Sequence, residues 1–140
     1  MLFNTPSVQE LAPIIAQTIV PAFLLGALAS FLSVLTTRLS RVVDQITLLK
    51  ATEDQEIANR RIPNLKRRAA LAHRAIFWAI VSAIIIAAMV VVSFASAFAN
   101  IQHERGVAIM FIFALIALIV ALVSFARETQ IASRDIQDMA

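Results

Sequence analysis

The sequence predicts an all-α membrane protein with three transmembrane helices and a long cytoplasmic helical hairpin between the first and the second. Composition is the first reason, because 60% of the 140 residues are hydrophobic, only 15% are charged, and the mean hydropathy is +0.83. Such a chain has too little polar surface to coat a soluble core of this size. Pattern is the second reason, because three long apolar runs alternate with polar segments. We therefore expect a single domain, residues 1–140, that is integral to a membrane.

The first membrane helix is predicted over residues 13–37, after an external lead of residues 1–12. Residues 14–35 carry no charged side chain over 22 positions. At 1.5 Å per residue, a helix of that length spans roughly 33 Å, which matches a hydrocarbon core of about 30 Å. A single crossing is therefore expected here.

Polar residues and a proline mark the outer end of this helix. Ser7 has the pattern of an N-cap with Glu10 at the third helical position, which predicts a helix start inside the lead. Pro21 lies inside the membrane helix and removes one backbone hydrogen bond there. Gln17 and Thr18 lie at this weak point. Either they form a polar site near the outer leaflet, or they only satisfy backbone groups that the proline frees.

Residues 38–74 are predicted to form the cytoplasmic helical hairpin. Its first arm has apolar residues at alternating spacings of 4 and 3, which is typical of a helix that packs on another helix. A polar stretch that ends at Pro63 is expected to be the turn, with Asn64 as the cap of the second arm. The predicted seam between the arms consists of Leu35, Leu39, Val42, Ile46, Leu49, Leu65, Ala69 and Ala72.

The rest of the chain divides at its polar segments. The second membrane helix is predicted over residues 75–99, an external loop over residues 100–106, and the third membrane helix over residues 107–126. A cytoplasmic tail, residues 127–140, follows as a helical extension.

The distribution of Lys and Arg predicts the orientation. Residues 38–74 hold nine of the twelve basic residues, the tail holds two, the external loop holds one, and the lead holds none. Basic residues gather on the cytoplasmic side of membrane proteins. The N-terminus is therefore expected outside and the C-terminus in the cytoplasm.

The segments PAFLLG and VLTTRLSRVVD, and the HRAI that follows a basic stretch, resemble a small bacterial integral membrane protein family known as domain of unknown function 2721. The resemblance covers about residues 7–130. It implies the same architecture and a bacterial inner-membrane location, and it implies no activity. The residues that match the family's pattern in the first helix are Pro21, Gly26, Leu35, Thr36, Arg38, Leu39, Arg41, Val43 and Asp44.

Candidate catalytic and metal-binding residues are scarce. None of the three spans contains an acidic or basic side chain, which argues against a proton relay or an ion site inside the membrane. The two histidines, His73 and His103, fall at opposite ends of the second span, and no serine lies near a histidine and an acid at motif spacing. The chain also has no cysteine. We expect no enzyme, no metal and no cofactor.

A basic set lies near the cytoplasmic surface. It can be the positive-inside bias alone, or it can attract anionic lipid headgroups, which contribute about 1 kcal/mol for each residue near the surface. Nucleic acid is not expected as a partner, because no aromatic residues are interleaved with the charges. The set consists of Arg60, Arg61, Lys66, Arg67, Arg68 and Arg74.

A stripe of small residues runs along the first helix within an arc of about 80°, and two charged residues continue it into the cytoplasm. Small residues let helix backbones approach closely in lipid. The stripe can pack on the third helix of the same chain, or on another chain. It consists of Ala22, Gly26, Ser30, Ser33 and Thr37, followed by Arg41 and Asp44.

Together these features predict a non-enzymatic membrane protein that self-associates, or that is an accessory or scaffold subunit of a larger inner-membrane complex. The alternative is an oligomeric channel or transport component lined by small hydroxyl residues. Those hydroxyls would come from Ser30, Ser33, Thr37, Ser82, Ser93 and Ser96.

Overall fold

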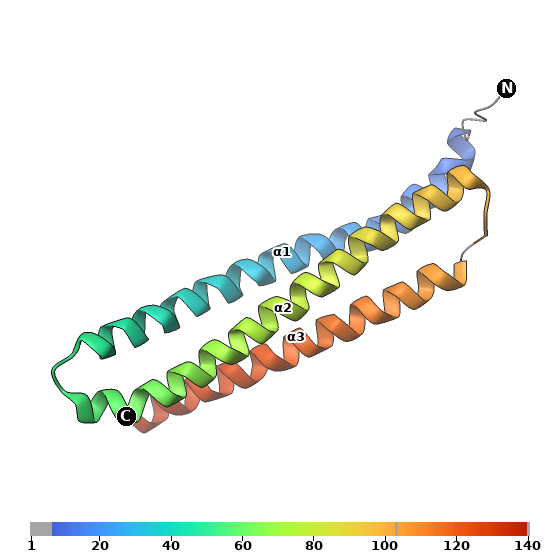
Figure 1. The fold of residues 1–140 in the computed structure, drawn as a ribbon. Coiled ribbons are helices and arrows are strands. Elements are labelled where there is room, and N and C mark those ends of the chain that lie inside the picture. Colours follow the sequence, from blue (N-terminus) through green and yellow to red (C-terminus); the bar gives the residue numbers. More distant parts are fainter. Residues whose placement is uncertain (1–6, 103, 140) are drawn as a thin grey trace.

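Three long helices make up the computed structural model, which describes residues 7–102 and 104–139. Helix α1 spans Val8–Ala51, α2 spans Gln55–Ala99 and α3 spans Glu104–Met139. They lie side by side and reverse direction at each connection (Figure 1). Each contains an apolar stretch long enough to cross a membrane, so the prediction of an all-α fold with three spans is confirmed. Residues 1–6 of the lead, His103 and Ala140 fall outside the described residues.

Helix α1 is continuous from the lead to well beyond the first apolar run. The Ser7 backbone N–H donates a hydrogen bond to Oε2 of Glu10 at 3.1 Å, so the expected capping pattern at the start of the helix is confirmed. The helix then continues through Pro13 and Pro21. The described part of the lead and the membrane span therefore form one element.

The turn between α1 and α2 is shorter than predicted and lies earlier in the chain. Helix α2 begins at Gln55, because the Asp54 carboxylate caps it by accepting hydrogen bonds from the backbone N–H groups of the next turn at 3.2 and 3.4 Å. The turn expected to end at Pro63 is therefore wrong, as is the cap at Asn64, since both residues lie inside α2. A strong cap upstream determines the helix start, and the helix continues through Pro63 although the proline removes one backbone hydrogen bond and crowds the preceding turn.

The second connection is also short. Helix α2 ends in the left-handed conformation of Asn100 (φ 53°), and the Ile101 N–H donates to the Ser96 carbonyl at 3.1 Å. This is a common way to satisfy the last carbonyls of a helix. Helix α3 then begins at Glu104, so the last three residues of the expected loop 100–106 are helical.

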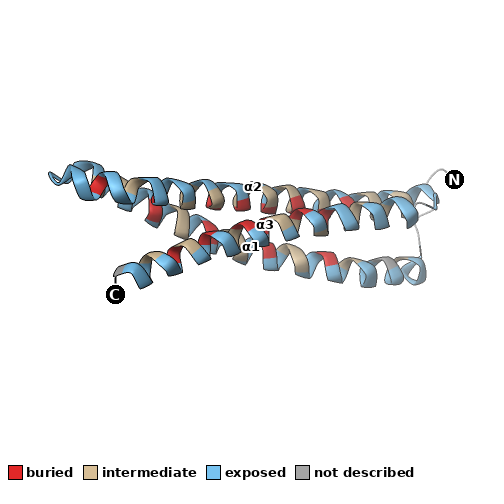
Figure 2. Cartoon of the chain, turned by 90° about the horizontal axis from the view of Figure 1, so that it is seen from below, coloured by how far each residue is buried: buried red, intermediate tan, exposed pale blue. Residues whose placement is uncertain are grey.

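Helix α2 is the middle element of the bundle. It packs along both neighbours, whereas α1 and α3 approach each other only at isolated positions. The buried residues gather on the facing sides of the helices (Figure 2). Alanines dominate this core on α2 and α3, which lets their backbones come close. The residues of the central cluster are Leu28, Ala79, Ile86, Ala114 and Ala121.

Beyond the apolar runs the three helices continue together as a polar extension, which we define as residues 38–74 and 127–139. The predicted seam faces inward here: Leu35, Val42, Leu65 and Ala72 are buried, and the other four seam residues are partly buried. Helix α3 accompanies the two arms, because Nδ2 of Asn64 donates to Oδ1 of Asp135 at 3.4 Å. The extension is therefore a three-helix structure, where the sequence predicted two paired arms and a helical tail for which it gave no partner.

Candidate functional site

A buried ion cluster joins all three helices where the polar extension begins. Glu128 of α3 is only 1% exposed, and its Oε1 accepts a hydrogen bond from Nε of Arg68 of α2 at 3.1 Å. Its Oε2 lies 3.1 Å from Nη1 of Arg38 of α1. Within the described residues Oε2 accepts no hydrogen bond, so this second contact is an ion pair without hydrogen-bond geometry. One carboxylate thus holds a cation from each of the other two helices.

Arg38 is held in place by further contacts with α3. Its Nη1 donates a hydrogen bond to Oγ1 of Thr129 at 2.8 Å, and its guanidinium lies 5.1 Å from the centre of the Phe125 ring. That ring in turn packs edge-to-face on Phe31 of α1, with 5.4 Å between the ring centres. Because α1 and α3 otherwise approach each other little, these contacts form the main junction between them.

Glu128 was predicted only as part of the cytoplasmic tail, and its place in a buried cluster was not foreseen. A signal was present: Glu128 continues the spacing of 3 and 4 residues that the small residues of the third span follow, which places it on the inner face of α3. Its partners could not be identified, because they lie 60 and 90 positions away in the chain. The buried residues that define this inner face are Ala114, Ala117, Ala121, Ser124, Glu128 and Ala132.

The cluster also fixes how α2 and α3 align. A second polar contact lies deep between them, where the buried Ser82 hydroxyl donates to the Ala114 carbonyl at 2.8 Å. From Arg68 to Ser82 and from Ala114 to Glu128 there are 14 residues in each helix, a rise of about 21 Å. The two antiparallel helices therefore keep one register between these points. A shift by a turn would break both contacts at once.

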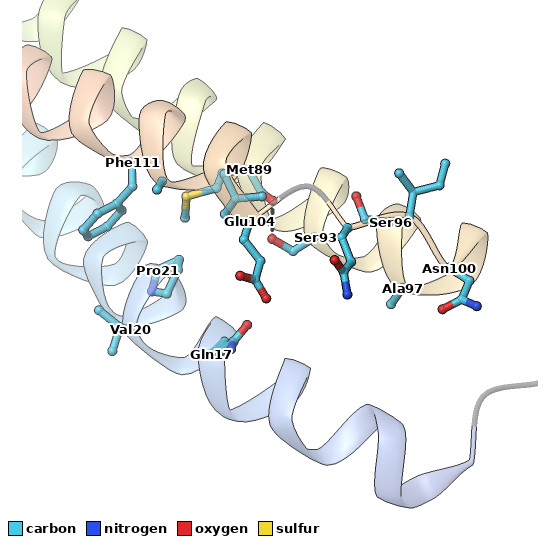
Figure 3. A pocket seen from close by; sticks show the side chains of 14 residues that line it. Gln17, Val20, Pro21, Met89, Ser93, Ser96, Ala97, Asn100, Glu104 and Phe111 are labelled. Atoms are coloured by element: carbon cyan, nitrogen blue, oxygen red, sulfur yellow. Dashed lines mark hydrogen bonds between the residues drawn. The ribbon is translucent and has the colours of Figure 1, made fainter.

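A cavity of about 730 Å³ lies at the end of the bundle away from the polar extension (Figure 3). It is lined by residues of all three helices and of the α2–α3 connection. Its inner end is apolar and includes Pro21, Met89 and Phe111. Polar side chains line the rest, and within residues 7–102 and 104–139 Glu104 contributes the only charge to the lining. We call this space the outer cavity. Its polar lining residues are Gln17, Ser93, Ser96, Asn100, Gln102 and Glu104.

The structure separates the two polar residues that the sequence placed near Pro21. The Thr18 hydroxyl donates to the Ile15 carbonyl at 2.8 Å and so satisfies its own helix. Gln17 faces the outer cavity, in the direction of Glu104 (Figure 3). Among the residues that the structure describes, neither Gln17 nor Glu104 has a side-chain hydrogen-bond partner.

The small-residue stripe lies on the outer surface of α1. All its members are exposed in the single chain, as are Arg41 and Asp44 beyond it. A Cβ atom placed on Gly26 would meet no atom within 4 Å. The stripe therefore does not pack on α3 of its own chain, which was one of the two expectations.

The basic set does not form one patch. Arg68 pairs with Glu128 and is only 15% exposed, so its guanidinium faces a carboxylate of α3. Arg60 pairs with Glu56 at 3.2 Å on the surface of α2. From Arg60 to Arg74 the helix rises about 21 Å, which is more than twice a physiological Debye length of roughly 8 Å. Arg60 and Arg61 therefore lie well beyond one Debye length from Arg74 along the helix axis.

The hydroxyls proposed to line a channel face different directions. The Ser82 hydroxyl is buried against α3, and the Ser93 hydroxyl donates to the Met89 carbonyl of its own helix at 2.8 Å. Ser30, Ser33 and Thr37 lie on the opposite, outer surface of α1. They do not converge on one surface of the chain.

No group of three or more potential metal ligands occurs among residues 7–102 and 104–139. The described residues thus contain three candidate sites. Two have a defined geometry, the buried ion cluster and the outer cavity, and the third is the exposed small-residue stripe of α1.

The fold is consistent with a multi-pass membrane protein, because all three helices are long and apolar enough to span a bilayer. The chain belongs to the family described as "Protein of unknown function (DUF2721)", whose model matches residues 18–137. The resemblance noted from the first helix is thereby confirmed. The matched region contains all three members of the ion cluster. Neither the curated proteins nor the solved structures contain a significant match to this chain.

Proposed function

We propose that this protein is a non-enzymatic, multi-pass protein of the bacterial inner membrane that assembles with itself, or with a larger membrane complex, through the outer surface of α1. One observation supports this most strongly. The small-residue stripe of α1 is fully available on the surface, while the opposite side of the same helix is occupied by α2.

The composition of the stripe favours a protein neighbour over lipid. Lipid tails are as apolar as leucine, so helices associate in a bilayer by close packing and hydrogen bonding. Gly26 and Ala22 allow a second helix to approach, and the hydroxyls of Ser30 and Ser33 can bond across such a contact. A surface meant only for lipid has no need of small or hydroxylated side chains.

Two charged residues extend the stripe into the polar extension. Neither Arg41 nor Asp44 forms an ion pair within the described part of the chain. In a symmetric dimer, a residue on one chain contacts its complement on the other and the contact repeats in reverse. Arg41 of one copy paired with Asp44 of the other would satisfy both pairs at once.

Replacing Gly26 with leucine tests this assembly. The substitution is expected to leave the chain folded, because no atom beyond the adjacent turns of α1 lies within 4 Å of the new Cβ. It is expected to reduce the mass of the assembly, measured by light scattering in mild detergent, because a leucine keeps two backbones apart. Ala27→Leu is the matched control, since Ala27 is exposed on α1 but lies outside the stripe. A wild type that is already monomeric, or equal masses for both variants, contradicts the proposal.

A channel receives no comparable support, because the hydroxyls it would require face opposite sides of the chain. A channel and an assembly subunit also differ in whether they conduct ions. Purified protein in liposomes conducts ions if it forms a pore, and an assembly subunit does not.

The proposed orientation puts the polar extension in the cytoplasm and the α2–α3 connection outside, following the charge bias. The cysteine-free chain allows a direct test with single cysteines at Glu56 and Gln102, both of which are exposed. In intact cells, an impermeant thiol reagent is expected to label Gln102→Cys and to spare Glu56→Cys until the membrane is opened. The reverse pattern means that the orientation is inverted.

In this orientation, contact with anionic lipid is limited to the basic residues near the membrane surface. Arg74 lies closest to the apolar span of α2, whereas Arg60 and Arg61 lie near the far end of the polar extension. We therefore propose Arg74 as the principal lipid contact of the basic set, with Lys66 and Arg67 at greater distance and Arg68 engaged by Glu128.

A further inference from the structure

The outer cavity has the size and polarity of a binding site for one amphipathic molecule. Its volume of about 730 Å³ lies within the range of roughly 300–1,000 Å³ in which ligand sites fall. The space is a groove: α2 forms its floor through Met89 and Ser93, and the facing sides of α1 and α3 form its walls (Figure 3). Because α1 and α3 do not pack on each other along their length, the groove is open sideways to the bilayer.

The lining changes character along the groove. The end nearest the middle of the bundle is formed by Pro21, Met89 and Phe111, and the end nearest the helix termini by Ser96 and Asn100 (Figure 3). A hydrocarbon chain fits the first end and a polar head group the second. Water alone would leave the apolar end poorly solvated.

Two side chains at the centre of the groove lack partners. Gln17 from α1 and Glu104 from α3 point toward each other across it (Figure 3), and neither has a side-chain hydrogen-bond partner in residues 7–102 and 104–139. Both side chains are exposed in the single chain, so water can solvate them when the groove is empty, and a ligand would have to replace the hydrogen bonds of that water. Both can accept a hydrogen bond, so a ligand that donates several hydrogen bonds would satisfy them together.

Charge then selects the class of ligand. Glu104 contributes the only charge among the lining residues that the structure describes, so the groove favours a cation over an anion. A primary ammonium group donates three hydrogen bonds and carries a positive charge. We propose that the outer cavity binds a membrane lipid with a primary ammonium head group, placing the ammonium between Glu104 and Gln17 and an acyl chain against Met89 and Phe111.

Native mass spectrometry of the full chain in mild detergent tests this proposal. The probes are phosphatidylethanolamine, phosphatidylcholine, whose methylated ammonium cannot donate hydrogen bonds, and phosphatidylglycerol, which has no ammonium. The fraction of protein that retains one lipid is expected to be highest for phosphatidylethanolamine. Glu104→Gln is expected to weaken that retention about tenfold, because it removes one charge-assisted hydrogen bond.

Two further variants make the result specific. Glu10→Gln is the matched control, since Glu10 is an exposed carboxylate at the same end of the bundle that does not line the groove. It is expected to leave retention unchanged. Ala108→Phe fills the groove from an exposed position on α3 and is expected to abolish retention of phosphatidylethanolamine.

Several outcomes overturn the proposal. Equal retention of the three lipids by the wild type means that no ammonium is recognised. An unchanged lipid fraction for Glu104→Gln means that the carboxylate serves only the start of α3, where an acid is favourable in any case. A change in the mass of the assembly for Ala108→Phe, with lipid retention intact, means that the groove holds another protein chain.

Discussion

Replacing Glu128 with alanine is expected to lower the free energy of unfolding by about 3 kcal/mol, the low end of what breaking a buried ion pair costs. The substitution leaves the guanidinium groups of Arg38 and Arg68 without their carboxylate. Arg38 is 30% exposed and Arg68 is 15% exposed, so each can reach water in part, which keeps the cost near that lower limit. The single tryptophan, Trp78, packs against the central core cluster and can report unfolding by its fluorescence in a titration with denaturing detergent.

Two comparison variants show whether this effect belongs to the ion pairs. Asp138→Ala removes an exposed acid from the same helix and is expected to change stability by no more than about 0.5 kcal/mol. The triple variant Glu128→Leu, Arg38→Met and Arg68→Met removes all three charges and fills the space with apolar groups. It is expected to recover most of the lost stability, because a buried ion cluster seldom contributes more to the free energy of unfolding than well-packed apolar side chains of similar volume. A Glu128→Ala protein as stable as the Asp138→Ala protein would mean that the cluster carries no net stabilisation.

If apolar side chains can stabilise the bundle equally well, the charges of Glu128, Arg38 and Arg68 must contribute something other than stability. We expect the ion cluster to contribute packing specificity that apolar residues would not. It joins α1 to α3, which otherwise meet little, and together with the contact between Ser82 and Ala114 it fixes the register of α2 on α3. An apolar replacement can slide by a turn at little cost, whereas a displaced carboxylate loses both of its cations. We therefore expect the triple variant to be stable but less uniquely packed.

The sequence was sufficient to predict the fold, because the membrane imposes a simple rule. Spans must be long, apolar and helical, and each of the three runs meets these conditions. The helix ends were less predictable. Pro63 looked like a stop, but the Asp54 cap begins α2 nine residues earlier, and tertiary packing on both sides supports the helix through the proline. The boundary depended on the Asp54 cap, which a search for helix breakers does not find.

Sequence patterns could not predict the ion cluster or the outer cavity, for a different reason. The ion cluster brings together three side chains, one from each helix, and the outer cavity is bounded by all three helices as well. Their assembly depends on the register of the helices, which no local spacing encodes. Gln17 shows the limit clearly: the sequence marked it as a polar residue near a proline, but only the position of Glu104 on α3 shows what it faces.

The polar extension gives the second large expected effect, which concerns Val42. This residue is 1% exposed, whereas its neighbour Val43 is 45% exposed. Val42→Asp places a carboxylate on the buried side of α1. The cation one turn earlier on that face, Arg38, is already held by Glu128, so we expect the new charge to cost several kcal/mol. We expect the extension to relieve this cost by opening, while the three apolar spans remain inserted, since their packing does not involve this position.

Trypsin reports that opening, because the extension contains nine basic residues between positions 38 and 74. Proteolysis of a transiently open segment follows the population of its open form, and about 3 kcal/mol raises that population more than 100-fold. Cleavage of Val42→Asp is therefore expected to be at least tenfold faster than that of the wild type. Val43→Asp introduces the same charge one position away on an exposed surface and is expected to be cleaved at the wild-type rate. Equal cleavage of the two variants would mean that the arms of the extension are held together by the membrane spans alone, and not by the buried side of α1.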